Sequence, residues 1–366
     1  MRVLALSVAY LPHMGGIEVL LHDMAAELVR RGHQIEIVSA DRVGPGEVDG
    51  VVVHRIDVDG PVASKDVRAI RDVQRRLGAI VDRFDPDVVH AHEIGPLLWT
   101  YQRATRARRR PLVATVHNTM TEMVGLPAST YSLMAGLLGE ADVVTAVSEL
   151  AVTDTLSFAP LIRDSIRYVP NGVSAPCSSG QPVDRDLVVG VGRLAHQKGW
   201  DVAIDAMRLV RERRPQTRMM IAGVGDDEED LRRRIEAAGL VGVVVLAGRL
   251  EQAEARRLME RAALVVMPSR FEGLPLVALE AAWAGRPVVG ARVSGLTEAV
   301  VDGVTGVLVD GEQPALLADA MLGVLDDPSR SDALGGAAVE RARALYGLGS
   351  CVDRYEAIYR ELTTAR

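Results

Sequence analysis

Two glutamates eight residues apart, Glu272 and Glu280, form the pattern in this chain that most suggests chemistry. The apolar run at residues 263–267 is typical of a buried strand, and Pro275 suits the first turn of a following helix. Glu272 is then expected on the strand-to-helix loop and Glu280 inside the helix. The helix N-terminus would offer N–H groups to a phosphate. Carboxylates on both sides of that anion site suit a diphosphate that carries hydroxyls at each end, as a nucleotide sugar does; the alternative is a pair of solvated surface glutamates.

A second candidate site follows the expected strand at residues 187–191, where Arg193 and Lys198 lie five residues apart on a glycine-bearing loop. Arginine offers a planar fork to phosphate oxygens, and lysine offers a point charge. The chain has one other lysine, Lys65, which makes the lysine in this loop more notable. The two cations therefore indicate an anion clamp, with a pair of solvated surface cations as the alternative.

The N-terminal half offers two further candidates. Gly15 and Gly16 follow an expected strand at residues 3–8 and open a helix, so that backbone could approach a ligand at the helix N-terminus. His117 ends the strand expected at residues 112–117 and could bind a sugar hydroxyl or a phosphate. A tight turn and a histidine satisfied within the fold are the alternatives.

Short apolar runs that alternate with amphipathic stretches must position these groups, and this alternation predicts an α/β fold with doubly wound parallel sheets. A small, polar, proline-containing linker at residues 174–182 separates two such series, so we expect two domains facing a cleft, with ligands at the carboxyl ends of the strands. The expected strands are residues 3–8, 35–39, 51–56, 88–92, 112–117, 143–147 and 166–169, then 187–191, 218–222, 243–247, 264–267, 287–290 and 306–309. The expected domains are residues 1–171 and 172–347, with a C-terminal helix at about 348–366 that packs back on the first domain.

Composition excludes several classes of function. The net charge of −7 over 366 residues gives no reason to expect nucleic acid as a partner. There is no run of eighteen apolar residues to cross a membrane, and no signal peptide is expected. Cys177 and Cys351 are too few for a disulfide framework or a zinc site, so a cytoplasmic location is the simplest expectation.

Other motifs argue against a cofactor. The glycines at residues 190–192 and 223–225 do not complete a dinucleotide fingerprint, so no nicotinamide cofactor is expected. The acidic run at residues 226–230 suits the first turn of a helix better than a metal site. Neither motif therefore indicates a cofactor or a metal site, and none is expected.

Taken together, these segments resemble the retaining glycosyltransferase family 4, whose members have the GT-B fold of two Rossmann-like domains. The resemblance covers essentially the whole chain, and the glutamate pair is its most specific part. It is carried by residues 15–16, 117, 169–173, 192–199, 272–280, 284–289, 295–298 and 302–306.

The resemblance implies a role for each matching residue. Arg193 and Lys198 would bind the donor diphosphate, Glu280 would accept hydrogen bonds from the ribose, Glu272 would contact the transferred sugar, and His117 would lie beside the reacting sugar. Further donor contacts would come from Gly15, Gly16, Gly248, Arg249, Leu250, Gly273, Leu274 and Leu276. Many members have Phe-Gly where this chain has Leu274 and Pro275, which puts the backbone contacts to the sugar in doubt but not the roles of the glutamates.

The resemblance also implies a metal-independent transfer that retains the anomeric configuration and gives an α-glycoside. The positive charges of Arg193 and Lys198 and the helix N-termini would stabilise the departing diphosphate in place of a metal cation. A uridine diphosphate sugar is the first expectation for the donor and a guanosine diphosphate sugar the second.

The acceptor is the least determined part. Candidates by position are His13, Glu18, His92, Glu93, Asn118 and Glu122. A small polar acceptor of natural-product biosynthesis is favoured because no lipid-facing patch is evident; peripheral membrane contact, a phosphoinositide-type lipid and a polysaccharide remain alternatives. A nucleotide-sugar 2-epimerase of the same fold and a non-catalytic relative are the rival functions. The sequence makes no prediction of the oligomeric state.

Overall fold

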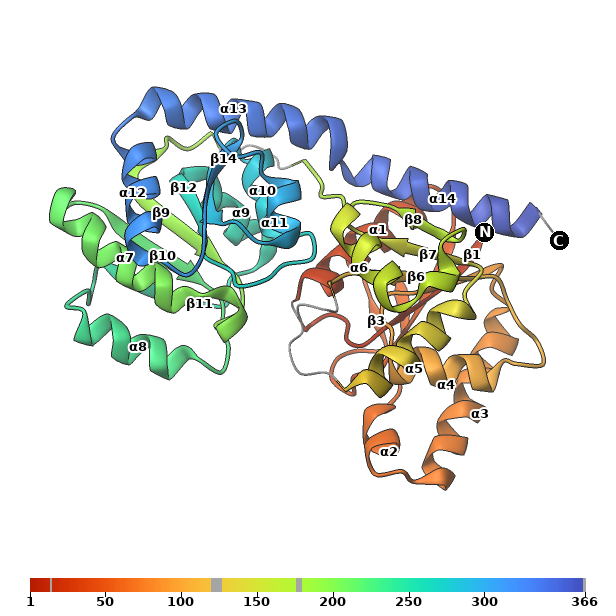
Figure 1. The fold of residues 1–366 in the computed structure, drawn as a ribbon. Coiled ribbons are helices and arrows are strands. Elements are labelled where there is room, and N and C mark those ends of the chain that lie inside the picture. Colours follow the sequence, from red (N-terminus) through yellow and green to blue (C-terminus); the bar gives the residue numbers. More distant parts are fainter. Residues whose placement is uncertain (14, 120–126, 176–179, 365–366) are drawn as a thin grey trace. The chain divides into compact units, whose positions relative to one another are not determined.

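The computed structural model describes residues 1–13, 15–119, 127–175 and 180–364 (Figure 1). The chain divides into two compact units, one of Met1–Gly172 with Leu348–Arg366 and the other of Val173–Gly347. Glu122, a candidate acceptor residue, and Cys177 lie outside the described residues. Each unit is built on one sheet, as the alternating pattern of strands and helices predicts.

The sheet of the first unit has eight strands in the order β3-β4-β2-β1-β5-β6-β7-β8. All of its pairs are parallel except β3–β4, an antiparallel edge pair that the sequence did not predict because β3 is two residues long. Strands β5, β6 and β7 are buried along their whole length, which explains their continuous apolar sequences. The strands are β1 (Arg2–Ser7), β2 (Gln34–Ser39), β3 (Glu47–Val48), β4 (Val51–Arg55), β5 (Val88–Ala91), β6 (Leu112–Val116), β7 (Val143–Ala146) and β8 (Ile166–Tyr168).

The helices of the first unit alternate with its strands. The longest of them before the linker, α3, begins at an aspartate cap whose side chain accepts two backbone N–H groups. The helices are α1 (Gly16–Arg30), α2 (Asp59–Ala63), α3 (Val67–Phe84), α4 (Pro96–Ala104), α5 (Ala128–Gly139), α6 (Glu149–Phe158), the 3₁₀ turn η1 (Pro160–Ile162) and the C-terminal α14 (Leu348–Thr364).

Helix α14, blue in Figure 1, packs against α1 and β5 of the first unit. Its buried face includes Tyr355 and Tyr359. At its edge Glu356 accepts hydrogen bonds from the Arg31 guanidinium at 2.6 Å and lies 2.6 Å from the His33 ring. Apolar burial and a partly buried ion-pair cluster together hold this C-terminal helix to the N-terminal sheet.

The second unit has a six-stranded parallel sheet in the order β11-β10-β9-β12-β13-β14. Its strands are β9 (Asp184–Val191), β10 (Arg218–Ala222), β11 (Val244–Gly248), β12 (Ala262–Met267), β13 (Val288–Ala291) and β14 (Gly306–Val309). Its helices are η2 (His196–Lys198), α7 (Trp200–Arg213), α8 (Glu228–Ala237), α9 (Gln252–Arg261), α10 (Leu276–Trp283), α11 (Ser294–Ala299), α12 (Pro314–Leu325) and α13 (Pro328–Leu345). Acidic residues occupy the first turn of α8, as expected.

Each sheet has a point at which the strand order reverses. In the first unit β1 lies between β2 and β5, and in the second β9 lies between β10 and β12. Open parallel sheets bind ligands beyond the carboxyl ends of the strands at such a point. The loops after β1 and β5, and those after β9 and β12, are therefore where the topology favours ligand binding. None of the helices in the described ranges is long and apolar enough to span a bilayer.

Candidate functional site

The loop after β9 holds Arg193 and Lys198 in a fixed backbone arrangement. The Trp200 indole N–H donates to the Arg193 carbonyl at 2.8 Å. Gly199 has a φ of 66°, and a Cβ at this position would lie 2.1 Å from the Pro268 carbonyl oxygen. Only glycine fits this approach, so the start of α7 sits directly against the loop that follows β12.

Lys198 and Glu272, predicted from two separate motifs, form one ion pair. The Lys198 Nζ lies 2.6 Å from Glu272 Oε1, and the two side chains are 17% and 6% exposed. The Ser269 hydroxyl donates to the same carboxylate oxygen at 2.7 Å. The fold thus places a cation and an anion in mutual contact at the carboxyl ends of the adjacent strands β9 and β12.

The start of α11 supports the Glu272 loop from behind. The Gly295 N–H and the Ser294 hydroxyl both donate to the Glu272 carbonyl, at 3.1 and 2.7 Å. A Cβ at Gly295 would fall 1.4 Å from the Gly273 carbonyl oxygen, so the loop can lie here only because this residue is glycine. Sequence reasoning found the segment at residues 295–298 but missed this supporting role.

Glu280 lies inside α10, as predicted, whereas Pro275 is the residue that caps the helix rather than part of its first turn. Arg256 Nε and Gln252 Nε2 donate to Glu280 Oε1, at 3.0 and 3.3 Å. Both partners belong to α9. The two glutamates therefore have different partners and occupy two separate positions in the second unit.

The other residues of the second unit that were expected to bind the donor lie near these two positions. Gly248 ends β11 with a φ of 70° and accepts a hydrogen bond from Gly223, and Arg249 and Leu250 lead directly into α9, whose side chains hold Glu280. The residues Gly273, Leu274 and Leu276 continue from Glu272 into α10. Arg193 is exposed, and its guanidinium donates to the Gln197 side chain at 3.0 Å.

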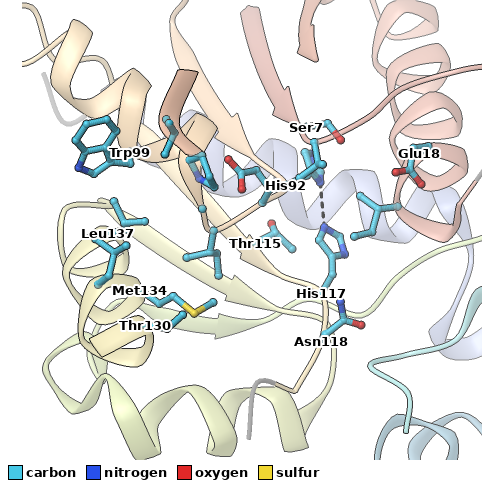
Figure 2. A pocket seen from close by; sticks show the side chains of 18 residues that line it. Ser7, Glu18, His92, Trp99, Thr115, His117, Asn118, Thr130, Met134 and Leu137 are labelled. Atoms are coloured by element: carbon cyan, nitrogen blue, oxygen red, sulfur yellow. Dashed lines mark hydrogen bonds between the residues drawn. The ribbon is translucent and has the colours of Figure 1, made fainter. Parts of the chain in front are cut away.

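The first unit contains a cavity of about 550 Å³ beyond the carboxyl ends of β1, β5 and β6 (Figure 2). Five residues expected from the sequence line it, namely Glu18, His92, Glu93, His117 and Asn118. Glu18 lies in the first turn of α1, which Gly15 caps and Gly16 begins, so the paired glycines adjoin the cavity. His13 is exposed and is not among the lining residues, so the structure does not bring it to this site.

Three buried histidines form the floor of the site. His92 Nδ1 lies 3.2 Å from His117 Nε2, and the rings of His90 and His92 are 3.9 Å apart between centroids. Burial lowers the pKa of His117 to about 4. Burial, with the nearby charge of His117, lowers the pKa of His90 to about 3, and burial also holds the pKa of His92 well below its usual range. All three imidazoles are therefore neutral at neutral pH, and of the two nitrogens that meet between His92 and His117 one donates and the other accepts.

A buried hydrogen-bond chain connects this floor to the C-terminal helix. His90 Nδ1 lies 2.6 Å from the Tyr359 hydroxyl of α14, and His90 Nε2 lies 2.6 Å from Thr115 Oγ1. Thr115 lines the cavity and also contacts Thr145 Oγ1 at 2.6 Å. Helix α14 thereby fixes side chains beneath the cavity, a link that spans more than 200 residues of sequence and leaves no local signal.

Glu93 is a second titratable group of the cavity. Its Oε1 accepts the Leu98 N–H at 2.8 Å, at the start of α4. Burial raises the pKa of Glu93 to about 7 against the opposing effect of the backbone N–H groups of Leu98 and Leu97. The carboxyl group is thus partly protonated near neutral pH and can donate as well as accept a hydrogen bond.

Other parts of the site carry no clear sequence signal. Three side chains orient the two glutamates, namely Ser269, Gln252 and Arg256. The sequence around Ser269 is typical of an ordinary loop, and that around Gln252 and Arg256 is typical of an amphipathic helix. The apolar lining of the cavity, including Trp99 and Met134, likewise reads as core. In the described ranges, no three side chains of histidine, cysteine, aspartate or glutamate come together in a way that could hold a metal ion.

Comparison with known proteins places this geometry in a family. Residues 14–175 match the family described as Glycosyltransferase Family 4, and residues 176–341 match that described as Glycosyl transferases group 1. The chain is 31% identical to D-inositol 3-phosphate glycosyltransferase 1 of Catenulispora acidiphila, covering 94% of this chain and 90% of the relative. It is 30% identical to the GDP-mannose-dependent α-(1-6)-phosphatidylinositol monomannoside mannosyltransferase of Mycolicibacterium smegmatis, with 88% and 89% covered.

The fold is shared with solved structures of lower identity. The Anabaena protein Alr3699/HepE in complex with UDP-glucose superposes with a TM-score of 0.81 at 20% identity, over the full length of both chains. Two parallel-sheet units of this architecture are the GT-B fold that the sequence led us to expect. The chain belongs to the group 1 glycosyltransferases of family 4 and is a nucleotide-sugar glycosyltransferase of GT-B type.

Proposed function

We propose that this enzyme transfers a sugar from a nucleoside diphosphate sugar, with UDP the first expectation for the nucleotide and GDP the second, to an acceptor hydroxyl with retention of configuration. The observation that carries the donor assignment is the buried Lys198–Glu272 ion pair at the strand-order reversal of the second unit. A donor sugar phosphate has anionic oxygens for the lysine and hydroxyls for the carboxylate. The pair therefore matches the two chemical halves of the donor.

On the donor side, each residue has a distinct task. Lys198 and Arg193 bind the diphosphate, and the N–H groups at the start of α10 add partial positive charge. Glu280, oriented by Arg256 and Gln252, accepts hydrogen bonds from the ribose hydroxyls. These cations and N–H groups stabilise the charge on the departing diphosphate, so the proposed mechanism needs no metal.

In the transfer step the bond from the anomeric carbon to the diphosphate oxygen breaks as the bond from that carbon to the acceptor oxygen forms. The nucleoside diphosphate leaves with the electron pair, and the acceptor's hydroxyl proton passes to it. We assign His117 to the reacting sugar, because its pKa of about 4 leaves a neutral imidazole that can hydrogen-bond a hydroxyl without adding a charge. We assign the acceptor to the cavity of the first unit.

The comparisons support the donor class but leave the acceptor open. Alr3699/HepE is described in complex with UDP-glucose, whereas the M. smegmatis relative is described as dependent on GDP-mannose. The names of two relatives point to different acceptors. The C. acidiphila relative is named for inositol 3-phosphate, and the M. smegmatis relative for phosphatidylinositol monomannoside.

The two lysines of the chain allow a direct test of the donor site. Lys65 is exposed and Lys198 is paired with Glu272, so acetylation by sulfosuccinimidyl acetate can be quantified at both positions by peptide mass spectrometry. We expect UDP to slow acetylation of Lys198 in a concentration-dependent way and to leave Lys65 unchanged. The nucleotide that protects at the lowest concentration, among UDP, GDP and ADP, identifies the donor.

Two results would contradict the assignment. If no nucleotide changes acetylation at either lysine, the donor site is not where we place it. If a nucleotide binds by calorimetry while Lys198 labels at the same rate, then the diphosphate is bound by other residues.

A further inference from the structure

The cavity of the first unit has two ends of different chemistry. Figure 2 shows Trp99, Met134 and Leu137 gathered at one end, and His117 and Asn118 at the other. The apolar side chains come from α4 and α5, whereas the polar ones follow the carboxyl end of β6. A ligand that fills the cavity would therefore meet mainly hydrophobic groups at one end, where Thr130 is the polar exception beside Met134, and mainly hydrogen-bonding groups at the other.

Apolar surface is left exposed at this cavity. Leu133 is 53% exposed and Val8 is 49% exposed, and both line it. An apolar side chain that is open to solvent on the wall of a ligand-sized cavity gains free energy when a hydrophobic group covers it. A volume of about 550 Å³ lies within the range of pockets that bind single drug-sized molecules.

The charge of the lining disfavours a phosphorylated ligand. Among the residues that the structure describes around the cavity, Glu18 and Glu93 carry carboxyl groups and none is a lysine or arginine. Arg103 lies over the Trp99 ring, 5.8 Å from its centroid, but is not part of the lining. A phosphate in the cavity would meet these carboxyl groups, and the described lining offers it no lysine or arginine as a counter-charge.

We propose that the acceptor is a non-phosphorylated alcohol or phenol with a compact apolar body. The body occupies the end formed by Trp99, Met134 and Leu137, and the hydroxyl points to His117. This inference rests on the proposed function, since it names the acceptor of the same transfer. It differs from the small polar acceptor expected from the sequence, because Trp99, Met134 and Leu137 give the cavity an apolar wall.

The orientation fits the balance of the transfer step. The acceptor oxygen forms the new bond to the anomeric carbon, the nucleoside diphosphate departs with the electron pair of the broken bond, and the hydroxyl proton leaves with the diphosphate. Neutral His117 Nδ1 is available to hydrogen-bond the reacting groups while its Nε2 is engaged by His92. The apolar body keeps water away from this hydroxyl and so limits hydrolysis of the donor.

The test uses the full chain and two probes of opposite chemistry, 2-naphthalenemethanol and myo-inositol 1-phosphate. Binding of each is measured by calorimetry with and without UDP, in the wild type, in Leu133→Gln and in Leu161→Gln. Leu161 is 97% exposed, lies on η1 and is not part of the cavity lining, so it is a matched control for the same substitution. Leu133→Gln changes an exposed position of α5, so the fold should tolerate it.

We expect the naphthyl alcohol to bind and the inositol phosphate not to bind. Leu133→Gln should weaken naphthyl binding roughly fivefold, since about half of a leucine side chain loses its apolar contact, and Leu161→Gln should leave it unchanged. With a UDP-sugar present, the same alcohol should increase UDP release.

The acceptor inference and the donor assignment can fail separately. Naphthyl binding that is absent, or that is equal in the wild type and Leu133→Gln, overturns the inference, as does preferential binding of inositol phosphate. Loss of UDP binding with naphthyl binding intact would instead overturn the proposed function while the cavity's preference for an apolar body stands.

Discussion

Replacing Lys198 with methionine should destabilise this protein much more than the same replacement at Lys65. Methionine keeps the length and most of the apolar stem of lysine but removes the charge. In the native chain Lys198 Nζ lies 2.6 Å from a Glu272 carboxylate that is only 6% exposed. Without the ammonium group, the Glu272 carboxylate still accepts a hydrogen bond from the Ser269 hydroxyl but loses the positive charge of Lys198.

The size of the effect follows from burial. Removing one partner of a buried ion pair costs about 3–5 kcal/mol, because the other charge stays desolvated. Because 17% of the Lys198 side chain is exposed, water can partly reach the site. We therefore expect the free energy of unfolding to fall by about 3 kcal/mol, the lower end of this range. Lys65→Met changes an exposed side chain and should stay within about 0.5 kcal/mol of the wild type.

Urea unfolding followed by circular dichroism gives the free energy of unfolding for each variant. The double variant Lys198→Met with Glu272→Gln should be more stable than Lys198→Met alone, since the uncompensated carboxylate is gone. The expected role of the ion pair is refuted if Lys198→Met is no less stable than Lys65→Met, or if adding Glu272→Gln to Lys198→Met restores no stability.

Three further results are expected. Glu272→Gln should lower kcat by about tenfold or more, because the amide loses a charged acceptor for the sugar hydroxyls, while UDP affinity stays within about threefold. Lowering the pH from 7.5 to 5 should reduce the free energy of unfolding by about 2 kcal/mol for each of His90 and His117, because their folded pKa values of about 3 and 4 mean that the unfolded chain binds more protons. Glu93, with a folded pKa of about 7, gains protons in the folded chain and should restore about 2 kcal/mol. Gly295→Ala should abolish transfer, since its Cβ would fall 1.4 Å from a carbonyl oxygen of the Glu272 loop.

Each of these expectations has a control. Glu236 is an exposed glutamate on α8, and Glu236→Gln should leave kcat unchanged. Gly239→Ala is the control for Gly295→Ala. An added Cβ at Gly239 would meet no other atom, although the backbone φ is 68°, so this variant tests whether a strained glycine substitution in the second unit abolishes transfer by itself. Equal stability at pH 5 and 7.5 would show that the histidines are not buried as described, and an active Gly295→Ala enzyme would show that the loop can move aside.

The sequence predicts the parts of this fold that depend on local patterns. Continuous apolar strands such as β5 and β6 are recognisable because they are buried on both faces, and the doubly wound architecture follows from their alternation with helices. The two-residue strand β3 is missed because so short a segment has no period, and its antiparallel pairing depends on β4. Pro275 precedes the first helical residue by one position, a difference within the one or two residues by which helix ends vary between criteria.

Sequence patterns likewise identify some residues of the candidate site but not the contacts between them. Lys198 and Glu272 are recognisable by residue type and by their place after strands, but their contact is set by strand order, which brings β9 beside β12. Arg256, which orients Glu280, lies on an amphipathic helix with many other charges and has no distinguishing signal. Trp99 and Leu133 read as core because sequence patterns distinguish apolar from polar faces but not a packed core from the wall of a cavity.

A calorimetric titration of UDP, GDP and ADP into the wild type, Glu280→Gln and Glu236→Gln measures the donor site of the second unit directly. We expect one nucleoside diphosphate to bind saturably. Its affinity should fall about tenfold or more in Glu280→Gln, which loses a charged acceptor for the ribose, and stay unchanged in Glu236→Gln. Binding that is equal in all three proteins, or no binding of any nucleotide, would contradict the donor site described for the second unit.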